Sequence, residues 1–112
     1  MNLIENQLQQ KNKNEDLERL LKLGTKGHFP LFYPDWITKA FKKMPVFAKM
    51  PCNLKIAETR VNQVFDLISK YQNLDRQRTA LLSLRENDRE EFIMSFIHMV
   101  EARMMDEIKP LH

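Results

Sequence analysis

Apolar residues recur at three- and four-residue spacing along two long segments of this chain, residues 54–71 and 92–108. This spacing places the apolar side chains on one face of an α-helix. The first segment carries Leu54, Ala57, Val61, Val64, Phe65, Ile68 and Tyr71, and the second carries Phe92, Phe96, Val100, Met104 and Ile108, with Ile93 and Ile97 beside them. Both segments are therefore predicted to be long helices that bury one face.

A shorter helix is predicted near the N-terminus from the residues at its two ends. Asn12 and Glu15 have the spacing of a capping box, and leucines follow at helical spacing. Gly24 is predicted to end this helix, because glycine readily adopts the left-handed conformation that closes a helix.

Another short helix is predicted over residues 75–86, after a break near Asn73. Asn87 and Asp88 each precede a glutamate by three residues, so both are candidate caps for the long helix that follows. Pro110 is predicted to end that last helix, since proline cannot continue one.

Prolines also divide the second quarter of the chain. Pro34 suits the first position of a helix whose apolar stripe includes Trp36 and Phe41. Pro45 and Pro51 disfavour helical geometry at the residues before them, so this helix is predicted to be kinked or broken.

These segments predict an all-α, single-domain bundle of four to five helices. No stretch alternates with the two-residue period of a strand, and the chain has only two glycines. A chain of 112 residues is long enough for one ordinary domain. We expect that domain to span residues 1–112, with residues 1–13 as a frayed end.

Charge is unevenly distributed, although the net charge of the whole chain is only +3. Residues 22–60 carry eight basic and two acidic side chains, whereas the segments on either side are slightly acidic. The middle third therefore produces a positive field that attracts an acidic partner and that salt weakens.

The same basic segment is also rich in aromatic rings. Residues 27–50 hold six of the ten aromatic residues of the chain, with four lysines among them. Such a segment is either core with a solvated basic edge or a docking surface. Six aromatic side chains, each with about 150–250 Å² of area, are difficult for an irregular segment to hide. We therefore expect part of this area to be exposed, most of all among Phe32, Tyr33, Trp36 and Phe47.

The sequence gives little sign of catalytic or metal chemistry. Cys52 follows Pro51, and Lys49 and Lys55 are close to it in sequence, which favours a thiolate. The sequence shows no general base and orienting group beside it, which nucleophilic catalysis would need. His98 has Glu101 and Glu91 at helical spacing, a weak pattern for a metal site. No phosphate-binding loop is present. We expect a protein that is not an enzyme, with no metal and no cofactor.

We expect a cytoplasmic protein. A single cysteine cannot form a disulfide within the chain, which suits a reducing compartment. No apolar run approaches the roughly 20 residues of a membrane span, and the first residues lack the pattern of a secretory signal.

The function predicted from these features is that of a small regulatory or adaptor protein that binds an acidic protein partner through a basic patch with aromatic residues. The predicted partner-binding residues are Tyr33, Trp36, Lys39, Lys42, Lys43, Phe47 and Lys49. The alternative is a nucleic-acid-binding regulator that uses the same segment, or Arg76, Gln77 and Arg78. Peripheral membrane contact is a third interpretation.

Self-association is a further expectation. Four methionines, Met94, Met99, Met104 and Met105, lie on the C-terminal helix, and Met94 and Met105 fall off its main apolar stripe. Methionine side chains adapt to different packing partners. A homodimer through this helix is therefore predicted.

Overall fold

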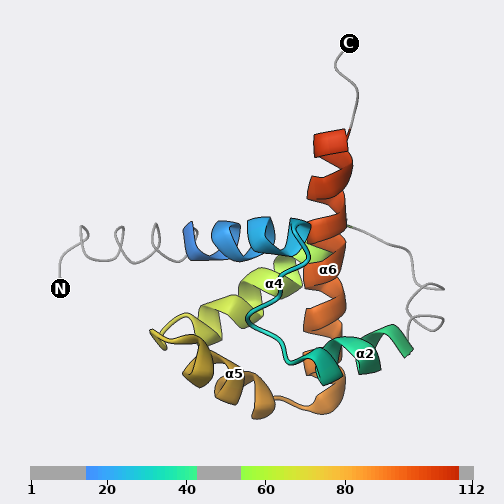
Figure 1. Cartoon of the computed structure of the whole chain (residues 1–112). Helices are drawn as coiled ribbons and strands as arrows, with labels where there is room; N and C mark the ends of the chain where they lie inside the picture. The colour runs from blue at the N-terminus through green and yellow to red at the C-terminus, as the bar shows by residue number, and fades with distance from the viewer. Residues whose placement is uncertain (1–14, 43–53, 109–112) are drawn as a thin grey trace.

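The computed structural model describes residues 15–42 and 54–108, and within these ranges the protein is all helical. An N-terminal helix spans residues 15–25. It is followed by α2 (Pro34–Lys42), α4 (Leu54–Ile68), α5 (Leu74–Leu82) and α6 (Glu86–Ile108) (Figure 1). The predicted all-α bundle of four to five helices is confirmed. The proposed breaks at Pro45 and Pro51 lie outside the described residues, as do the proposed caps and ends at Asn12 and Pro110.

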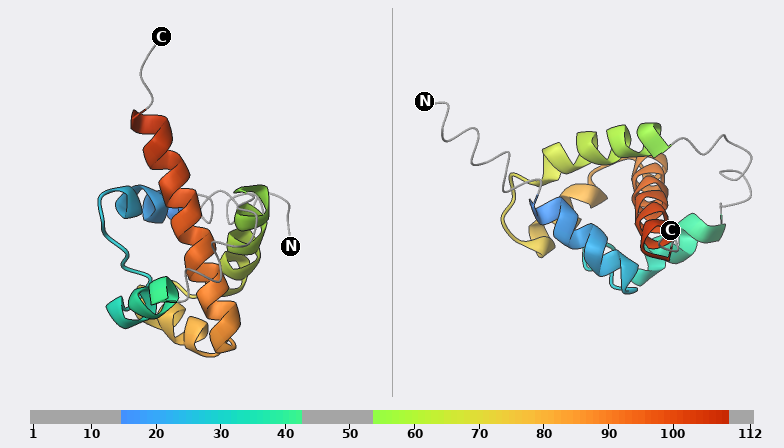
Figure 2. Two further views of the ribbon diagram at one scale, coloured as in Figure 1. Left: turned by 90° about the vertical axis from the view of Figure 1, so that its right-hand side faces the viewer. Right: turned by 90° about the horizontal axis from the view of Figure 1, so that it is seen from above.

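The long helix α6 forms the centre of the bundle. Figure 2 shows α4 on one side of α6 and α2 on another, and the N-terminal helix crosses α6 near its middle. Glu90 and every residue from Phe92 to Ile97 are buried. The sequence pattern indicated one buried stripe; the structure instead covers α6 on several sides because three other helices pack around it.

This central position corrects the expectation for the methionines of α6. Met94, expected to lie off the core, is buried in it, and so is Met99. Only Met104 and Met105 expose large parts of their side chains, beyond the stretch that the other helices cover. The adaptable methionine surface is thus reduced to the last described turns of α6.

The end of the N-terminal helix differs from the prediction. Gly24 is still helical, and the chain turns at Gly27, whose φ is +86°. The amide of Gly27 donates to the carbonyl of Gly24, and the amide of His28 donates to the carbonyl of Leu23, both at 2.9 Å. This is the Schellman pattern of helix closure, with Gly27 in the left-handed position. The sequence analysis correctly predicted that a left-handed glycine closes this helix, but that glycine is Gly27 and not Gly24.

The boundaries of the later helices also differ from the predicted ones. Tyr71 lies after α4, in a turn closed by its amide on the carbonyl of Ile68. Asn73 caps α5, since its side chain accepts a hydrogen bond from the Arg76 amide at 2.8 Å. The last helix starts at Glu86, so the predicted caps Asn87 and Asp88 lie in its first turn. The spacing of possible cap residues in the sequence is compatible with more than one first residue for a helix. The packing of the helix decides which of these it is.

Aromatic rings from the loop before α2 complete the core. Phe32 lies between Phe92 and Phe96 of α6, with ring centroids 5.7 and 5.2 Å away in edge-to-face arrangements. Phe29 stacks on Phe32 and meets Phe96 edge to face. Buried residues from all five described helices join this loop in one hydrophobic core. The loop is therefore anchored in the core through Phe29 and Phe32, immediately before α2 begins.

No helix in the described ranges combines the length and the apolar character that crossing a membrane requires.

Candidate functional site

The predicted partner-binding residues divide into exposed, buried and undescribed groups. Tyr33 is 45% exposed, and Lys39 and Lys42 are fully on the surface. Trp36 is only 8% exposed and Phe32 is buried, so the expectation that these two rings are exposed is wrong. The remaining predicted residues lie outside the described ranges: Lys43, Phe47 and Lys49.

Trp36 is enclosed by two side chains that lie against its ring. The ring of Tyr33 meets it edge to face at 4.8 Å between centroids. The guanidinium carbon of Arg89, from the first turns of α6, lies 5.1 Å from the ring centroid of Trp36. Trp36 therefore joins the loop, α2 and α6, and its large area is used for packing.

Tyr33 is in turn covered by an arginine of α5. The guanidinium carbon of Arg78 lies 5.1 Å from the centroid of the Tyr33 ring. The four side chains form a continuous row in the order Arg78, Tyr33, Trp36, Arg89, with a cation at each end. Three helices and one loop contribute to this row, which we call the cation–aromatic row.

Arg78 also fastens α5 to the loop. Its Nη1 donates to the carbonyl oxygen of Pro30 at 2.6 Å, and its Nη2 bonds the carboxylate of Asp75. Its Nε–H is buried and finds no acceptor in the described part of the chain. Only 20% of the side chain is exposed. Arg78 is thus a structural clamp that holds Tyr33 at the surface.

Phe41 is an exposed aromatic residue that the sequence analysis placed on the apolar stripe of α2. It is 42% exposed and follows Tyr33 and Ile37 at four-residue intervals. Residues four apart lie on the same side of a helix, so these three side chains make an apolar edge along α2. The sequence did contain a signal for this exposure, because Phe41 lies at the border of the predicted apolar stripe.

Lys39 and Lys42 flank this edge on the solvent side of α2. Neither lysine forms an ion pair with any described residue. We call the set Tyr33, Ile37, Lys39, Phe41 and Lys42 the α2 surface; Ile37 is partly buried, and the other four residues are exposed. It combines half-exposed aromatic rings with the positive charge of two exposed lysines.

Arg78 and Arg89 are the site residues that sequence reasoning missed or misassigned. No pattern in the sequence pointed to Arg89, because it contacts Trp36 only when α6 packs against α2. Arg78 was considered together with Arg76 and Gln77 as a groove-reading set. The structure buries Gln77, whose Nε2 donates to the Tyr71 carbonyl at 2.8 Å, and leaves Arg76 alone on the surface.

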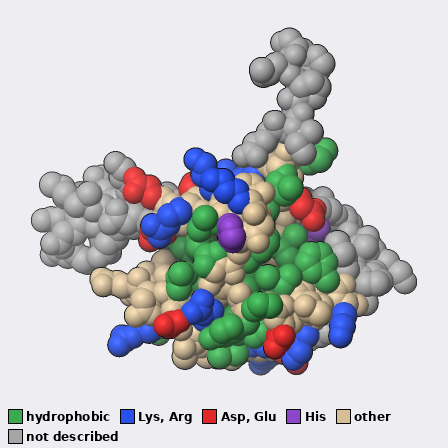
Figure 3. Space-filling view, in the orientation of Figure 1, with side chains coloured by type: hydrophobic (Ala, Val, Ile, Leu, Met, Phe, Trp, Pro, Cys, Tyr) green, Lys and Arg blue, Asp and Glu red, His purple; other side chains and the backbone are tan. Residues whose placement is uncertain are grey.

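Figure 3 shows one face of the molecule in the orientation of Figure 1. Hydrophobic side chains gather over its lower half, where α2, α5 and the start of α6 lie, and charged side chains are scattered around them.

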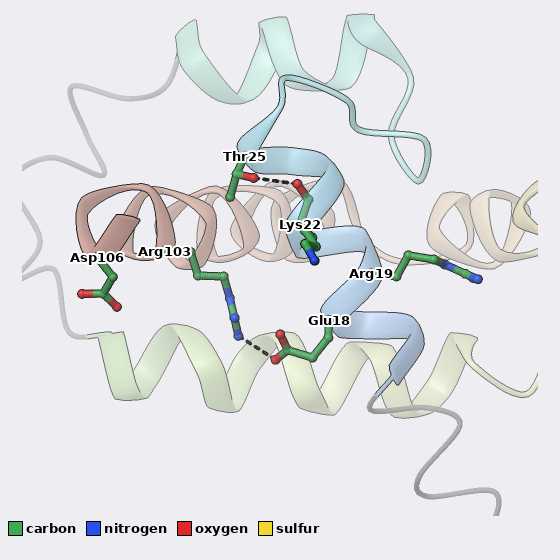
Figure 4. Close-up of a pocket in the computed structure, with 6 residues that line it drawn as sticks. All are labelled: Glu18, Arg19, Lys22, Thr25, Arg103 and Asp106. Atoms are coloured by element: carbon green, nitrogen blue, oxygen red, sulfur yellow. Dashed lines mark hydrogen bonds and ion pairs between the residues drawn. The ribbon is translucent and has the colours of Figure 1, made fainter. Parts of the chain in front are cut away.

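A polar hollow of about 650 Å³ lies between the N-terminal helix and α6 (Figure 4). Glu18 accepts a hydrogen bond from Arg103 at 2.6 Å across it, and the Thr25 hydroxyl donates to the Lys22 carbonyl. The other lining residues are Arg19, Lys22 and Asp106. Opposite charges are mixed and mostly solvated here, which suits ion pairing between helices better than recognition of one ligand charge.

A second hollow, of about 380 Å³, lies along the seam between α4 and α6. Val64, Leu84 and the buried Phe92 form its apolar part. Arg60 and Glu91 close its rim with a 2.7 Å ion pair. Glu91 is thus engaged by Arg60, while His98 faces Glu101, with Nδ1 3.9 Å from Oε2. No group of three or more potential metal ligands occurs among the described residues.

Cys52 lies outside the described residues. Comparisons of the chain with protein-family models, with curated proteins and with solved structures find no match.

Proposed function

We propose that this protein is a small, non-enzymatic adaptor or regulatory protein that binds an acidic protein partner through the α2 surface. The observation that carries the proposal is the exposure of Tyr33 and Phe41 at α2, beside two lysines that form no ion pair with any described residue. Aromatic anchors surrounded by charge are typical of the residues that dominate protein interfaces.

The apolar edge supplies the affinity in this proposal. Tyr33 and Phe41 are each more than two-fifths exposed, so a partner that covers them removes apolar area from water. Burial of such area contributes about 25 cal/mol per Å² before the costs of association. The cation–aromatic row and the loop core hold Tyr33 in place, and this reduces the entropy lost on binding.

The lysines supply steering. Lys39 and Lys42 have no acidic partners in the described part of the chain, and they lie in the segment with the strongest excess of positive charge. An acidic partner is attracted over long range, mainly through a faster association rate. This attraction falls as salt rises.

The burial of the predicted stacking rings favours a protein over a nucleic acid. Trp36 is enclosed, and Tyr33 has Arg78 over its ring and Trp36 against it, so neither ring has its stacking area fully available to a base. Gln77, a candidate for reading base edges, is buried. Nucleic-acid binding remains the alternative that the experiment must separate.

The test is affinity capture of the full chain from a lysate of the cells that express it, with and without nuclease, followed by binding measurements with the purified partner. Phe41→Ala and Tyr33→Ala are expected to raise the dissociation constant at least about tenfold. Lys39→Glu with Lys42→Glu is expected to slow association and to flatten its salt dependence.

Leu67→Ala is the matched control. Leu67 is a large apolar residue that is 57% exposed on α4, on the other side of α6 from α2. Its variant is expected to bind like the parent protein. Equal losses in the Phe41 and Leu67 variants would contradict a specific α2 surface. Capture that disappears with nuclease would replace the protein partner by nucleic acid.

A further inference from the structure

We propose that Arg89 is an anion-binding anchor at the edge of the α2 surface and takes a carboxylate side chain of the partner. This inference rests on the proposed function and names the chemistry by which the partner is recognised. It assigns a role to a residue of α6 that lies outside the basic segment of the sequence.

The guanidinium of Arg89 is held in one place. It lies over the Trp36 ring, and Trp36 itself is fixed by Tyr33 and by its burial. Arg89 is half-buried, unlike Arg85 one turn earlier, which is exposed. An arginine stacked on an aromatic face keeps the N–H groups at the edge of its plane directed outward.

These N–H groups have no carboxylate partner in the described part of the chain. Four other arginines do form ion pairs there: Arg19 with Asp16, Arg60 with Glu91, Arg78 with Asp75, and Arg103 with Glu18. Arg89 is partly buried, and its charge has no ion-pair partner among residues 15–42 and 54–108. Withdrawing a charged group from water without an acceptor costs free energy, and a carboxylate from outside would recover it.

The geometry favours a carboxylate as the ligand. A guanidinium presents two parallel N–H groups that match the two oxygens of a carboxylate, and such pairs are stronger than neutral hydrogen bonds. Glu86 and Asp88 are exposed in the first turn of α6, close to Arg89 in the sequence. Their negative charge disfavours a doubly charged phosphate more than a singly charged carboxylate.

The row also predicts the layout of the partner. Trp36 separates Arg89 from Tyr33, so an acidic residue bound at Arg89 places its neighbours beside the apolar edge of α2. Arg78 cannot bind a carboxylate of the partner in the same way, because its two terminal nitrogens already bond Pro30 and Asp75. The expected binding segment therefore joins one Asp or Glu to apolar or aromatic residues.

The first test uses acetate as the probe on the full-length protein. The Nε–Hε resonance of Arg89, assigned from its loss in Arg89→Lys, is followed by nuclear magnetic resonance during titration with sodium acetate. We expect a saturable shift for Arg89 and none for Arg85, with sodium chloride at equal ionic strength as the blank. No shift at Arg89 overturns the proposal. A larger shift with inorganic phosphate overturns the choice of carboxylate.

The second test uses the partner identified with the α2 surface. Arg89→Gln is expected to weaken binding at least about tenfold, the loss of a charge-assisted hydrogen-bonded pair. Arg89→Lys keeps the charge but lacks the fork, so it is expected to recover less than half of that loss in free energy. Arg85→Gln, the control at the exposed residue just before α6, is expected to change binding less than about twofold.

The outcomes separate the two proposals. Binding that is lost in Phe41→Ala but unchanged in Arg89→Gln contradicts the anchor and leaves the proposed function standing. Binding that is unchanged in all α2 variants contradicts the proposed function, while the acetate titration still decides whether Arg89 binds an anion. Thermal unfolding of each variant shows whether the Trp36 packing survives, and Arg89→Lys preserves most of that contact.

Discussion

Gly24 and Val100 touch where the N-terminal helix crosses α6. A Cβ atom built on Gly24 would lie 2.7 Å from Cγ2 of Val100 and 3.2 Å from Cε1 of Phe29. Real Cβ contacts are not this short, so the absence of a side chain at Gly24 sets how closely the two helices approach. Val100 is β-branched and has little rotamer freedom in a helix, so it cannot easily move aside.

Gly24→Ala is therefore expected to destabilise the protein, although alanine is normally the better helix former. The helix propensity favours alanine by about 1 kcal/mol, whereas overpacking of a close helix crossing costs about 1–3 kcal/mol. We expect a net loss in the free energy of unfolding, measured by urea denaturation. Val100→Ala in the same chain should remove the clash, so the two changes should not be additive. Additive losses would contradict the close contact.

Gly27→Ala tests the left-handed turn without any packing contribution. Gly27 has a φ of +86°, and nothing lies within 4 Å of a Cβ placed there. Strain alone should cost about 1 kcal/mol, and Gly27→Asn should cost less because asparagine tolerates this conformation better. Thermal unfolding of the two variants measures this order. Rescue of Gly27→Ala by Val100→Ala would contradict the distinction between the two glycines.

Trp36→Ala is expected to lower the free energy of unfolding by about 3 kcal/mol, the range for large aromatic truncations in a core. The ring is 8% exposed and contacts both Tyr33 and Arg89. Phe41→Ala on the same helix should cost about 1 kcal/mol or less, since much of that ring is already in water. Guanidinium denaturation compares them, and equal losses would mean that Trp36 is not part of the core.

Arg78→Lys is expected to loosen the loop that carries Tyr33. Lysine keeps the charge but cannot hydrogen-bond Pro30 and Asp75 while stacking on Tyr33, so we expect a loss of about 1–2 kcal/mol. Amide hydrogen exchange should become faster in residues 28–33. Arg76→Lys is the control, because Arg76 is exposed on the same helix and forms no ion pair with any described residue. Unchanged exchange in Arg78→Lys would contradict the clamp.

The pattern of apolar positions was sufficient to predict the helices. The repeats in residues 54–71 and 92–108 led to α4 and α6, and Pro34 marked the start of α2. These signals are local, because helix formation depends on neighbouring residues and on one buried face. The same pattern failed where several helices cover one, as at Met94, because a sequence does not state how many neighbours a helix has.

The candidate site was predicted only in part for the same reason. The basic and aromatic character of the segment around α2 was evident in the sequence, and Tyr33, Lys39 and Lys42 are exposed as expected. Whether each ring is core or surface depends on what packs against it. Phe32 and Trp36 are enclosed by α6, while Phe41 is left half in water.

The sequence by itself determined the helical class and the region in which aromatic rings and positive charge meet. Only the tertiary structure decided which rings remain exposed and which arginines join them. Arg78 and Arg89 reach Tyr33 and Trp36 across more than forty intervening residues of chain. Contacts between residues so far apart follow from the packing of whole helices, and no local periodicity encodes them.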